Sequence, residues 1–203
     1  ERYVRDGEWP KKPYPLSKAT LRDCTVGIVG MGRIGQAIAR RLEAMKVPVV
    51  YHSRRKNAEV ANKYYADLVE MARDVDALVV ITPGGAETHN MINAEVLKAL
   101  GPNGILINIA RGSVVDEPAL IAALKNGTIM AAGLDVFADE PSVPQDLIAM
   151  KNVVLFPHVG SASVYTRNAM DQLVADNLNV WFAGKPPLTP VPETPPSISK
   201  FRS

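Results

Sequence analysis

Three glycines between residues 30 and 35 are spaced to bind phosphate groups. The stretch Gly30-Met31-Gly32-Arg33-Ile34-Gly35 follows the apolar run Val26–Val29 and leads into an amphipathic helical pattern. In such a turn Gly30 allows a tight bend, Gly32 lets the backbone approach a pyrophosphate, and Gly35 lets helix and strand pack closely. The N–H groups at the helix start carry partial positive charge and can bind the diphosphate. The predicted dinucleotide contacts of this turn are Gly30, Gly32, Arg33, Ile34 and Gly35.

The segment after the second expected strand is basic and contains no carboxylate. It reads Tyr51-His52-Ser53-Arg54-Arg55-Lys56, where NAD-specific folds usually place an acidic residue for the ribose 2′-hydroxyl. A carboxylate would repel a 2′-phosphate, whereas a hydroxyl and guanidinium groups bind it by charge-assisted hydrogen bonds. A solvated basic loop is the alternative interpretation. We assign Ser53, Arg54 and Arg55 to the phosphate and expect NADP(H) as cofactor, although such loops also accept NAD(H).

Apolar runs without polar alternation predict the strands that position these loops. Such runs are typical of strands buried on both faces of a parallel sheet. The expected strands are Val26–Val29, Val47–Tyr51, Ala77–Ile81, Ile105–Ile109, Ala131–Leu134 and Val153–Phe156. With right-handed crossovers between them, the predicted fold class is α/β, a Rossmann-type doubly wound parallel sheet.

Helical patterns lie between and after these strands. One apolar face of a helix expected from about residue 33 to 46 is formed by Ile34, Ile38, Leu42 and Met45. Another helix is expected to begin at Asp116-Glu117-Pro118, since these residue types suit a helix N-terminus. The longest expected helix spans 161–183. Its residues at core spacing are Met170, Leu173, Val174, Leu178 and Trp181.

Composition and charge limit the classes of partner. Lys and Arg number 23 against 21 Asp and Glu, a net charge of +2, which gives no general field to attract nucleic acid or anionic lipid. No apolar run reaches the roughly 18 residues that span a bilayer. Cys24 is the only cysteine, so no intrachain disulfide forms and a reducing, cytoplasmic location is expected. Neither nucleic acid, membrane nor metal is an expected partner.

Four motifs in order resemble the D-isomer-specific 2-hydroxyacid dehydrogenases. They are the glycine motif at 26–35, Asn-Ile-Ala-Arg-Gly-Ser-Val-Val-Asp at 108–116, Gly-Leu-Asp-Val-Phe-Ala-Asp-Glu-Pro at 133–141, and Phe-Pro-His-Val-Gly-Ser at 156–161. Within this family the Ser-Arg-Arg loop is most similar to that of NADPH-dependent glyoxylate/hydroxypyruvate reductases. The resemblance implies hydride transfer between NADP(H) and a small 2-oxo or 2-hydroxy acid.

The resemblance implies a catalytic triad of Arg111, Glu140 and His158. The planar fork of Arg111 suits a substrate carboxylate and a polarised carbonyl. His158 is the implied general acid in reduction and base in oxidation. Glu140, paired with the imidazole, would favour its protonated form and fix the orientation of the ring. Each residue alone also fits an ordinary structural role, whereas their joint occurrence in matched motifs favours the functional one.

The resemblance also implies further cofactor and pocket contacts. Asp135 and the backbone near Ile109 are expected to contact the nicotinamide amide. The residues expected to line the pocket are Thr82, Pro83, Gly160 and Ser161. Small and turn residues are common at strand ends for structural reasons too.

The expected organisation is an arm at 1–20, a dinucleotide-binding domain at 21–184 and a proline-rich return segment and tail at 185–203. In the resembled family most of a substrate domain precedes the glycine motif, yet twenty-nine residues precede Gly30 here. We therefore expect most of that domain to be absent, cofactor binding to be retained, and turnover by this chain alone to be weak. A homodimer is expected, because this domain carries much of the family's dimer contact.

Alternative functions use the same scaffold. A non-catalytic dinucleotide-sensing module, as in the family's corepressor branch, is disfavoured by the complete set of Arg111, Glu140 and His158. Formate oxidation is disfavoured by Pro157, because that branch has a glutamine in this neighbourhood. A phosphoglycerate-type dehydrogenase is disfavoured as well, because such an enzyme would usually show an acidic end to the second strand and a regulatory extension. Another 2-hydroxyacid dehydrogenase that uses NAD stays open.

Overall fold

The computed structural model describes residues 2–16 and 20–191, and it divides into two compact units, residues 1–158 and 159–203. Parts of two predicted segments lie outside the described residues. These parts are residues 1 and 17–19 of the expected arm and residues 192–203 of the expected proline-rich tail.

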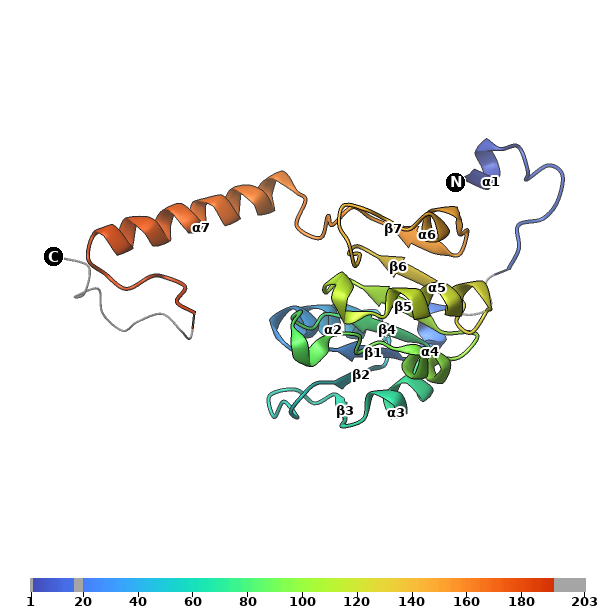
Figure 1. The fold of residues 1–203 in the computed structure, drawn as a ribbon, viewed down its shortest axis with the longest axis horizontal. Helices are drawn as coiled ribbons and strands as arrows, with labels where there is room; N and C mark the ends of the chain where they lie inside the picture. Colours follow the sequence, from blue (N-terminus) through green and yellow to red (C-terminus); the bar gives the residue numbers. More distant parts are fainter. Residues whose placement is uncertain (1, 17–19, 192–203) are drawn as a thin grey trace. The chain divides into compact units, whose positions relative to one another are not determined.

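Seven parallel strands form a single sheet in the first unit (Figure 1). They are β1 (Val26–Val29), β2 (Val49–His52), β3 (Lys63–Tyr65), β4 (Ala77–Val80), β5 (Ile105–Asn108), β6 (Ala131–Leu134) and β7 (Val153–Leu155). Their order is β3-β2-β1-β4-β5-β6-β7, with every neighbouring pair parallel. The chain therefore changes direction across the sheet at β1, which lies between β2 and β4. This arrangement confirms the predicted doubly wound sheet, and ligands of such sheets bind beside that reversal.

Four predicted strands have slightly different bounds in the structure, and one strand was not predicted. The strands β4, β5 and β7 each end one residue earlier than predicted. The second strand begins at Val49 and not at Val47, because Pro48 between them has no N–H to donate to the ladder; its carbonyl instead accepts a bond from Val26 N at 2.9 Å. The edge strand Lys63–Tyr65 was not predicted. It is three residues long and begins with an exposed lysine, so it lacks the apolar run by which the other strands were identified.

Helices of the first unit cover the sheet. They are α2 (Arg33–Ala44), α3 (Leu68–Arg73), α4 (Ala94–Leu100), α5 (Glu117–Lys125) and α6 (Gln145–Ala149), with short 3-10 helices η1 (Leu21–Asp23), η2 (Ala86–Thr88) and η3 (Gly112–Val114). The α5 helix begins where its Asp-Glu-Pro sequence predicted, and Asp116 caps it by accepting from Ala119 N.

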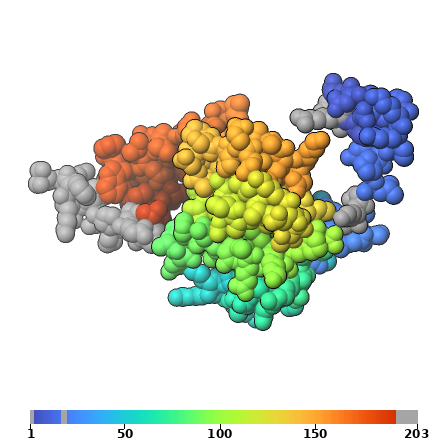
Figure 2. All heavy atoms as spheres, turned by 45° about the vertical axis from the view of Figure 1, so that its right-hand side comes forward, coloured from blue at the N-terminus to red at the C-terminus, as the bar shows by residue number. Residues whose placement is uncertain are grey.

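Apolar side chains form two buried clusters on opposite faces of the sheet. Alternate residues of a strand point to opposite faces, and Ile28 belongs to one cluster while its neighbour Val29 belongs to the other. Ile38 and Leu42 of α2 pack on the Ile28 cluster. In the space-filling view, the green to yellow part of the chain forms one closely packed body (Figure 2). The sheet therefore offers its strand ends, and not its faces, to a ligand.

The predicted apolar face of α2 is only partly buried. Ile38 and Leu42 are partly buried, as expected. Ile34 and Met45, at the two ends of the same face, are exposed. Ile34 therefore stands at the helix start without a core partner, where the dinucleotide contact was predicted.

The second unit contains α7 (Val164–Phe182), a 19-residue helix capped by Ser163. The helix itself was predicted, but the burial of its apolar stripe was not correctly predicted. Met170, Leu173, Val174 and Leu178 are between 43% and 60% exposed. Their spacing is that of a packed face, while the described residues of the unit leave much of it open. No helix within residues 2–16 and 20–191 is both long and apolar enough to cross a membrane.

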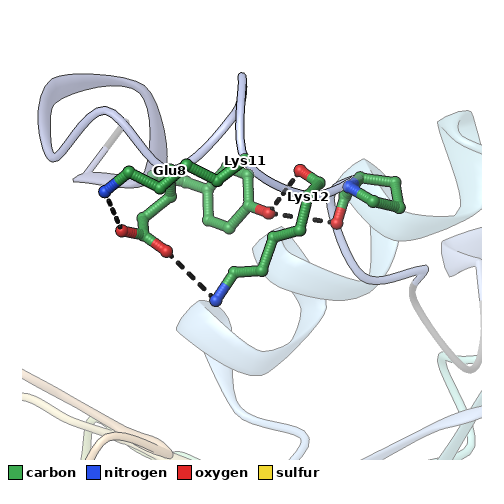
Figure 3. A network of polar contacts seen from close by, with 5 residues as sticks. Glu8, Lys11 and Lys12 are labelled. Atoms are coloured by element: carbon green, nitrogen blue, oxygen red, sulfur yellow. Dashed lines mark hydrogen bonds and ion pairs between the residues drawn. The ribbon is translucent and has the colours of Figure 1, made fainter.

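The arm of residues 2–16 contains α1 (Arg2–Arg5) and a compact polar network (Figure 3). Glu8 pairs with Lys11 and Lys12 at 3.1 Å each. These contacts, with Lys12 first, lower the pKa of Glu8. The Tyr3 hydroxyl donates to the carbonyl of Lys12 at 2.8 Å. The network is local to the arm and fixes its own conformation.

Candidate active site

Most of the predicted site residues follow the carboxyl ends of parallel strands and therefore lie along one edge of the sheet. The loops concerned follow β1, β2, β4, β5, β6 and β7. They carry Gly30, Ser53, Thr82, Arg111, Asp135 and His158 respectively. Since β1 lies at the reversal of strand order, the glycine turn has the β2 and β4 loops on its two sides.

Packing within the turn explains two of its glycines. Gly30 has a φ of +108°, and a Cβ there would lie 2.9 Å from the carbonyl oxygen of Ile81. A Cβ on Gly35 would lie 2.1 Å from the carbonyl oxygen of Gly30. Both positions therefore require glycine for the protein's own close contacts.

Gly32 is different, because no contact among the described residues requires a glycine there. Its φ is −79°, which any residue adopts, and a Cβ there would meet no atom of the described residues within 4 Å. Gly32 is also the N-cap of α2 and provides no side-chain cap, whereas Asp67 and Asn93 cap α3 and α4 through their side chains. Open space above a helix start without a side-chain cap fits a dinucleotide diphosphate.

The end of β4 adds a second observation that fits a cofactor. The Oγ1 atom of Thr82 is buried and has no hydrogen-bond partner among the described residues, although buried hydroxyls normally have one. Pro83 beside it is exposed, and its carbonyl accepts from the Thr88 hydroxyl at 2.8 Å. The loop is thus held in shape while one polar atom next to the glycine turn is left for a ligand.

Hydrogen bonds within the loop and from β3 hold the predicted 2′-phosphate loop in place. The Ser53 hydroxyl donates to the carbonyl of Arg55 at 2.7 Å, and the Tyr64 hydroxyl donates to the carbonyl of Ser53 at 3.2 Å. Arg54 and Arg55 are exposed. Arg54 pairs with Glu87 of η2 through Nη1 and Oε2 at 2.5 Å. The loop after β2 therefore presents two exposed arginines, and Arg54 already contacts a carboxylate.

Tyr51 and Asn57, which were not predicted as site residues, connect this loop to the glycine turn. The hydroxyl of Tyr51 accepts from Asn57 N at 2.9 Å. The amide of Asn57 donates to the carbonyl of Met31 at 3.4 Å, and its Oδ1 accepts from Glu59 N at 2.9 Å. Asn57 belongs to none of the sequence motifs, and its contact with Met31, 26 positions away, could not be predicted. The only sequence signal was an asparagine in a loop, which is a common turn residue.

Asn108 holds the turn that carries Arg111. It is fully buried at the end of β5. Its Oδ1 accepts from Ala110 N at 3.1 Å, and its Nδ2 donates to the carbonyl of Arg111 at 3.1 Å. The Arg111 side chain is exposed and bonds the Ala110 carbonyl through Nη1 at 2.6 Å. Asn108 begins the motif at 108–116, but its positioning role was not predicted.

The Arg111 loop packs directly against the loop that leads to Glu140. A Cβ on Gly112 would lie 1.8 Å from the carbonyl oxygen of Phe137, so only a glycine fits there. Phe137 N in turn donates to Oε1 of Glu140 at 3.0 Å. The two loops are therefore joined by backbone contact and by a hydrogen bond.

Glu140 and His158 form a hydrogen-bonded pair at the same edge. Nδ1 of His158 lies 2.7 Å from Oε2 of Glu140, with side-chain exposures of 50% and 34%. The bond to His158, followed by that to Phe137, lowers the pKa of Glu140; Arg111 adds a smaller charge effect in the same direction. His158 has a φ of +54°, a backbone conformation that is uncommon for residues other than glycine. With Nδ1 engaged, Nε2 is the imidazole nitrogen left for a substrate.

The remaining predicted residues divide between the two units. Asp135 is buried after β6, and its backbone N donates to the Asn108 carbonyl at 3.0 Å. Ile109 N donates to the Val80 carbonyl at 3.2 Å. Gly160 and Ser161 belong to the second unit, and their contact with the cofactor stays a prediction. Cys24 lies away from these loops; burial raises the pKa of its thiol, as expected for an inert cysteine.

Comparison with known protein families places this geometry in context. The sequence model described as "D-isomer specific 2-hydroxyacid dehydrogenase, NAD binding domain" matches residues 1–160. That range contains the whole sheet and the Arg111, Glu140 and His158 set.

Individual relatives match almost the whole chain. A glyoxylate/hydroxypyruvate reductase A of Arabidopsis thaliana is 49% identical over 94% of the chain. A hydroxyphenylpyruvate reductase of Plectranthus scutellarioides is 50% identical over 94%. The crystal structure of the NADPH-dependent glyoxylate/hydroxypyruvate reductase of Sinorhizobium meliloti, in complex with NADP and malonate, is 55% identical over 96% of the chain with a TM-score of 0.90. The chain spans 61% of the length of each of these three proteins.

Proposed function

Because the chain belongs to the D-isomer specific 2-hydroxyacid dehydrogenase family, we propose that its glycine turn binds NADP(H). We propose further that the complete protein transfers a hydride between this cofactor and a small 2-oxo or 2-hydroxy acid. The dinucleotide-binding domain is proposed to comprise residues 21–184. The observation that carries the catalytic proposal is the 2.7 Å contact between His158 and Glu140, at the sheet edge that also holds Arg111 and the glycine turn.

The chain's own residues provide the acid and the anchor that this reduction requires. When bound, the cofactor supplies the hydride. Arg111 would hold the substrate carboxylate and polarise the carbonyl. Nε2–H of protonated His158 would deliver a proton to the carbonyl oxygen, and the same nitrogen would accept it back during oxidation. Glu140 would keep Nδ1 protonated and the ring in place.

The site supports a class of substrate and not one compound. Arg111 recognises a carboxylate, and His158 serves a carbonyl beside it, which defines a 2-oxo acid. The relatives named above are reductases of glyoxylate, hydroxypyruvate and hydroxyphenylpyruvate, which differ in the group beyond that carbonyl. We propose a small 2-oxo acid, a homodimeric assembly and a cytoplasmic location, supported by the family, the single cysteine and the near-neutral charge.

Binding titrations with Arg54→Ala test the cofactor proposal. NADPH and NADH are titrated by isothermal calorimetry into the 203-residue chain and into the variant. Loss of a guanidinium that contacts the 2′-phosphate should weaken NADPH by tenfold or more, about 1.4 kcal/mol, and leave NADH unchanged. Arg41→Ala is the matched control, because Arg41 is exposed and bonds a carbonyl of its own helix.

Equal weakening of both cofactors by Arg54→Ala would contradict the phosphate assignment. Failure of the unsubstituted chain to bind either dinucleotide would contradict the proposed function itself. The catalytic part is tested in the complete protein, where Glu140→Gln and His158→Ala should each abolish most turnover while retaining NADPH binding. Unchanged turnover would favour a non-catalytic dinucleotide-sensing role.

A further inference from the structure

The Arg54–Glu87 ion pair links the two loops that flank the glycine turn. Arg54 follows β2, and Glu87 lies in η2 after β4. Because β2 and β4 are the two neighbours of β1, the pair extends across the end of β1. It therefore lies over the turn to which the dinucleotide was assigned, and it occupies a guanidinium proposed for the 2′-phosphate.

Both partners come from backbone segments that hydrogen bonds hold in place. On the Arg54 side, the Ser53 hydroxyl donates to the Arg55 carbonyl at 2.7 Å. On the Glu87 side, Thr88 is buried and its hydroxyl donates to the Pro83 carbonyl at 2.8 Å. The two charged side chains themselves are 76% and 72% exposed. The pair is thus set by its loops, yet it is open to solvent and to a competing anion.

We infer that Glu87 is a specificity-determining residue, whose carboxylate competes with the 2′-phosphate for Arg54 and lowers the preference for NADP(H) over NAD(H). This inference rests on the proposed function. A phosphate monoester carries a charge of about −1.5 to −2 at neutral pH, so it needs an uncompensated cation. Glu87 compensates the charge of Arg54 and so weakens the attraction of Arg54 for the phosphate. NAD(H) has no such phosphate, and its binding leaves the pair intact.

The strength of the pair sets the size of the expected effect. Exposed ion pairs contribute little in water, so a phosphate displaces Glu87 and NADPH binding persists. Arg55, in the same loop, provides a further guanidinium that this pair does not occupy. Glu87 therefore moderates the cofactor preference and does not block the site.

The test is a titration of NADPH and NADH into the chain and its Glu87→Gln variant. The variant keeps the side-chain size and removes the charge. We expect NADPH to bind about threefold to tenfold more tightly, with NADH unchanged. Asp146→Asn is the matched control: Asp146 pairs with Lys125 at 2.8 Å, with exposures of 55% and 50%, and its loss changes the net charge equally.

A double-mutant cycle with Arg54→Ala separates competition from a general charge effect. In the Arg54→Ala background, Glu87→Gln should change NADPH affinity by less than about twofold. An unchanged or reduced NADPH preference in Glu87→Gln would overturn the inference, as would an equal gain for NADH or a gain that persists without Arg54. If Arg54→Ala alone weakens NADPH while Glu87→Gln changes nothing, the proposed function stands and this inference falls. If the unsubstituted chain binds neither dinucleotide, both fall.

Discussion

Glu140 uses both carboxylate oxygens, so its ionisation controls how His158 is held. One oxygen accepts from His158 and the other from the backbone of Phe137. Both bonds favour the ionised form, and the pKa of Glu140 is therefore lowered from its ordinary value of 4.5. A group with a lowered folded pKa contributes stability above its unfolded pKa, and this contribution is lost as pH falls through the folded value.

Thermal unfolding of the wild type and Glu140→Gln from pH 7 to pH 3 measures this contribution. We expect a constant difference in Tm down to about pH 5, which shrinks below pH 4.5 as Glu140 protonates. The difference should be small, because solvent screens a partly exposed carboxylate. Glu59→Gln, in an exposed loop, serves as the charge control. A Tm difference for Glu140→Gln that stays constant to pH 3 would contradict the linkage.

The sequence predicted candidate residue types, but it could not predict most of the contacts between them. Arg111, Glu140 and His158 were identified through a resemblance of short motifs, and the structure places Glu140 against His158. The roles of Asn57 and Asn108 could not be predicted, because the sequence does not show whether an asparagine is buried or which groups it bonds. Glu87 carried no signal, since its contact with Arg54 depends on strand order and spans 33 positions.

At the level of elements, apolar runs predicted the central strands because parallel strands are buried on both faces. The same rule could not find β3, whose short edge position needs no apolar run. The α7 stripe was read as core-facing, but spacing alone reports that a face is apolar and not what covers it. The sequence thus specifies the sheet well and the surroundings of α7 poorly.

In the glycine turn between β1 and α2, one substitution should weaken dinucleotide binding without lowering the stability of the fold. Gly32→Ala has room for its Cβ and an ordinary φ, so we expect an unfolding free energy within about 0.5 kcal/mol of the wild type. Its methyl group stands where the diphosphate would approach, so NADPH and NADH should both bind about tenfold or more weakly. Urea unfolding and calorimetric titration measure the two quantities.

Gly133→Ala is the matched control for that prediction. A Cβ at Gly133 makes an ordinary contact of 3.9 Å with Ile107, so cofactor affinity should stay unchanged. Gly35→Ala should behave in the opposite way to Gly32→Ala, since its Cβ would collide with the Gly30 carbonyl and destabilise the fold itself. Cofactor affinity that survives Gly32→Ala would remove the turn from the proposed site.

At the scale of the whole molecule, the stable core belongs to the first unit. Both buried clusters lie within it, and α7 has no buried residue. Substitutions in these clusters should therefore lower the stability of the sheet. The effect can be measured through the slowest-exchanging amides of the central strands.

We expect Leu106→Ala to lower the opening free energy of β1, β4 and β5 by about 2–5 kcal/mol, because Leu106 is fully buried in the core. Hydrogen exchange of those amides gives the measurement. Ile148→Ala is the matched control within the same unit, because Ile148 is 52% exposed and its truncation should change the opening free energy by no more than about 0.5 kcal/mol. An equal effect of the two substitutions would contradict the assignment of the stable core to the buried clusters.

The contact between Gly112 and Phe137 has a consequence for engineering. Since the arginine-bearing loop rests on the backbone of the loop that carries the glutamate, neither can be transplanted into another scaffold by itself. A larger residue at position 112 would displace the Arg111 loop and the Glu140 loop together. Redesign of substrate preference therefore has to treat residues 108–112 and 137–140 as one cassette.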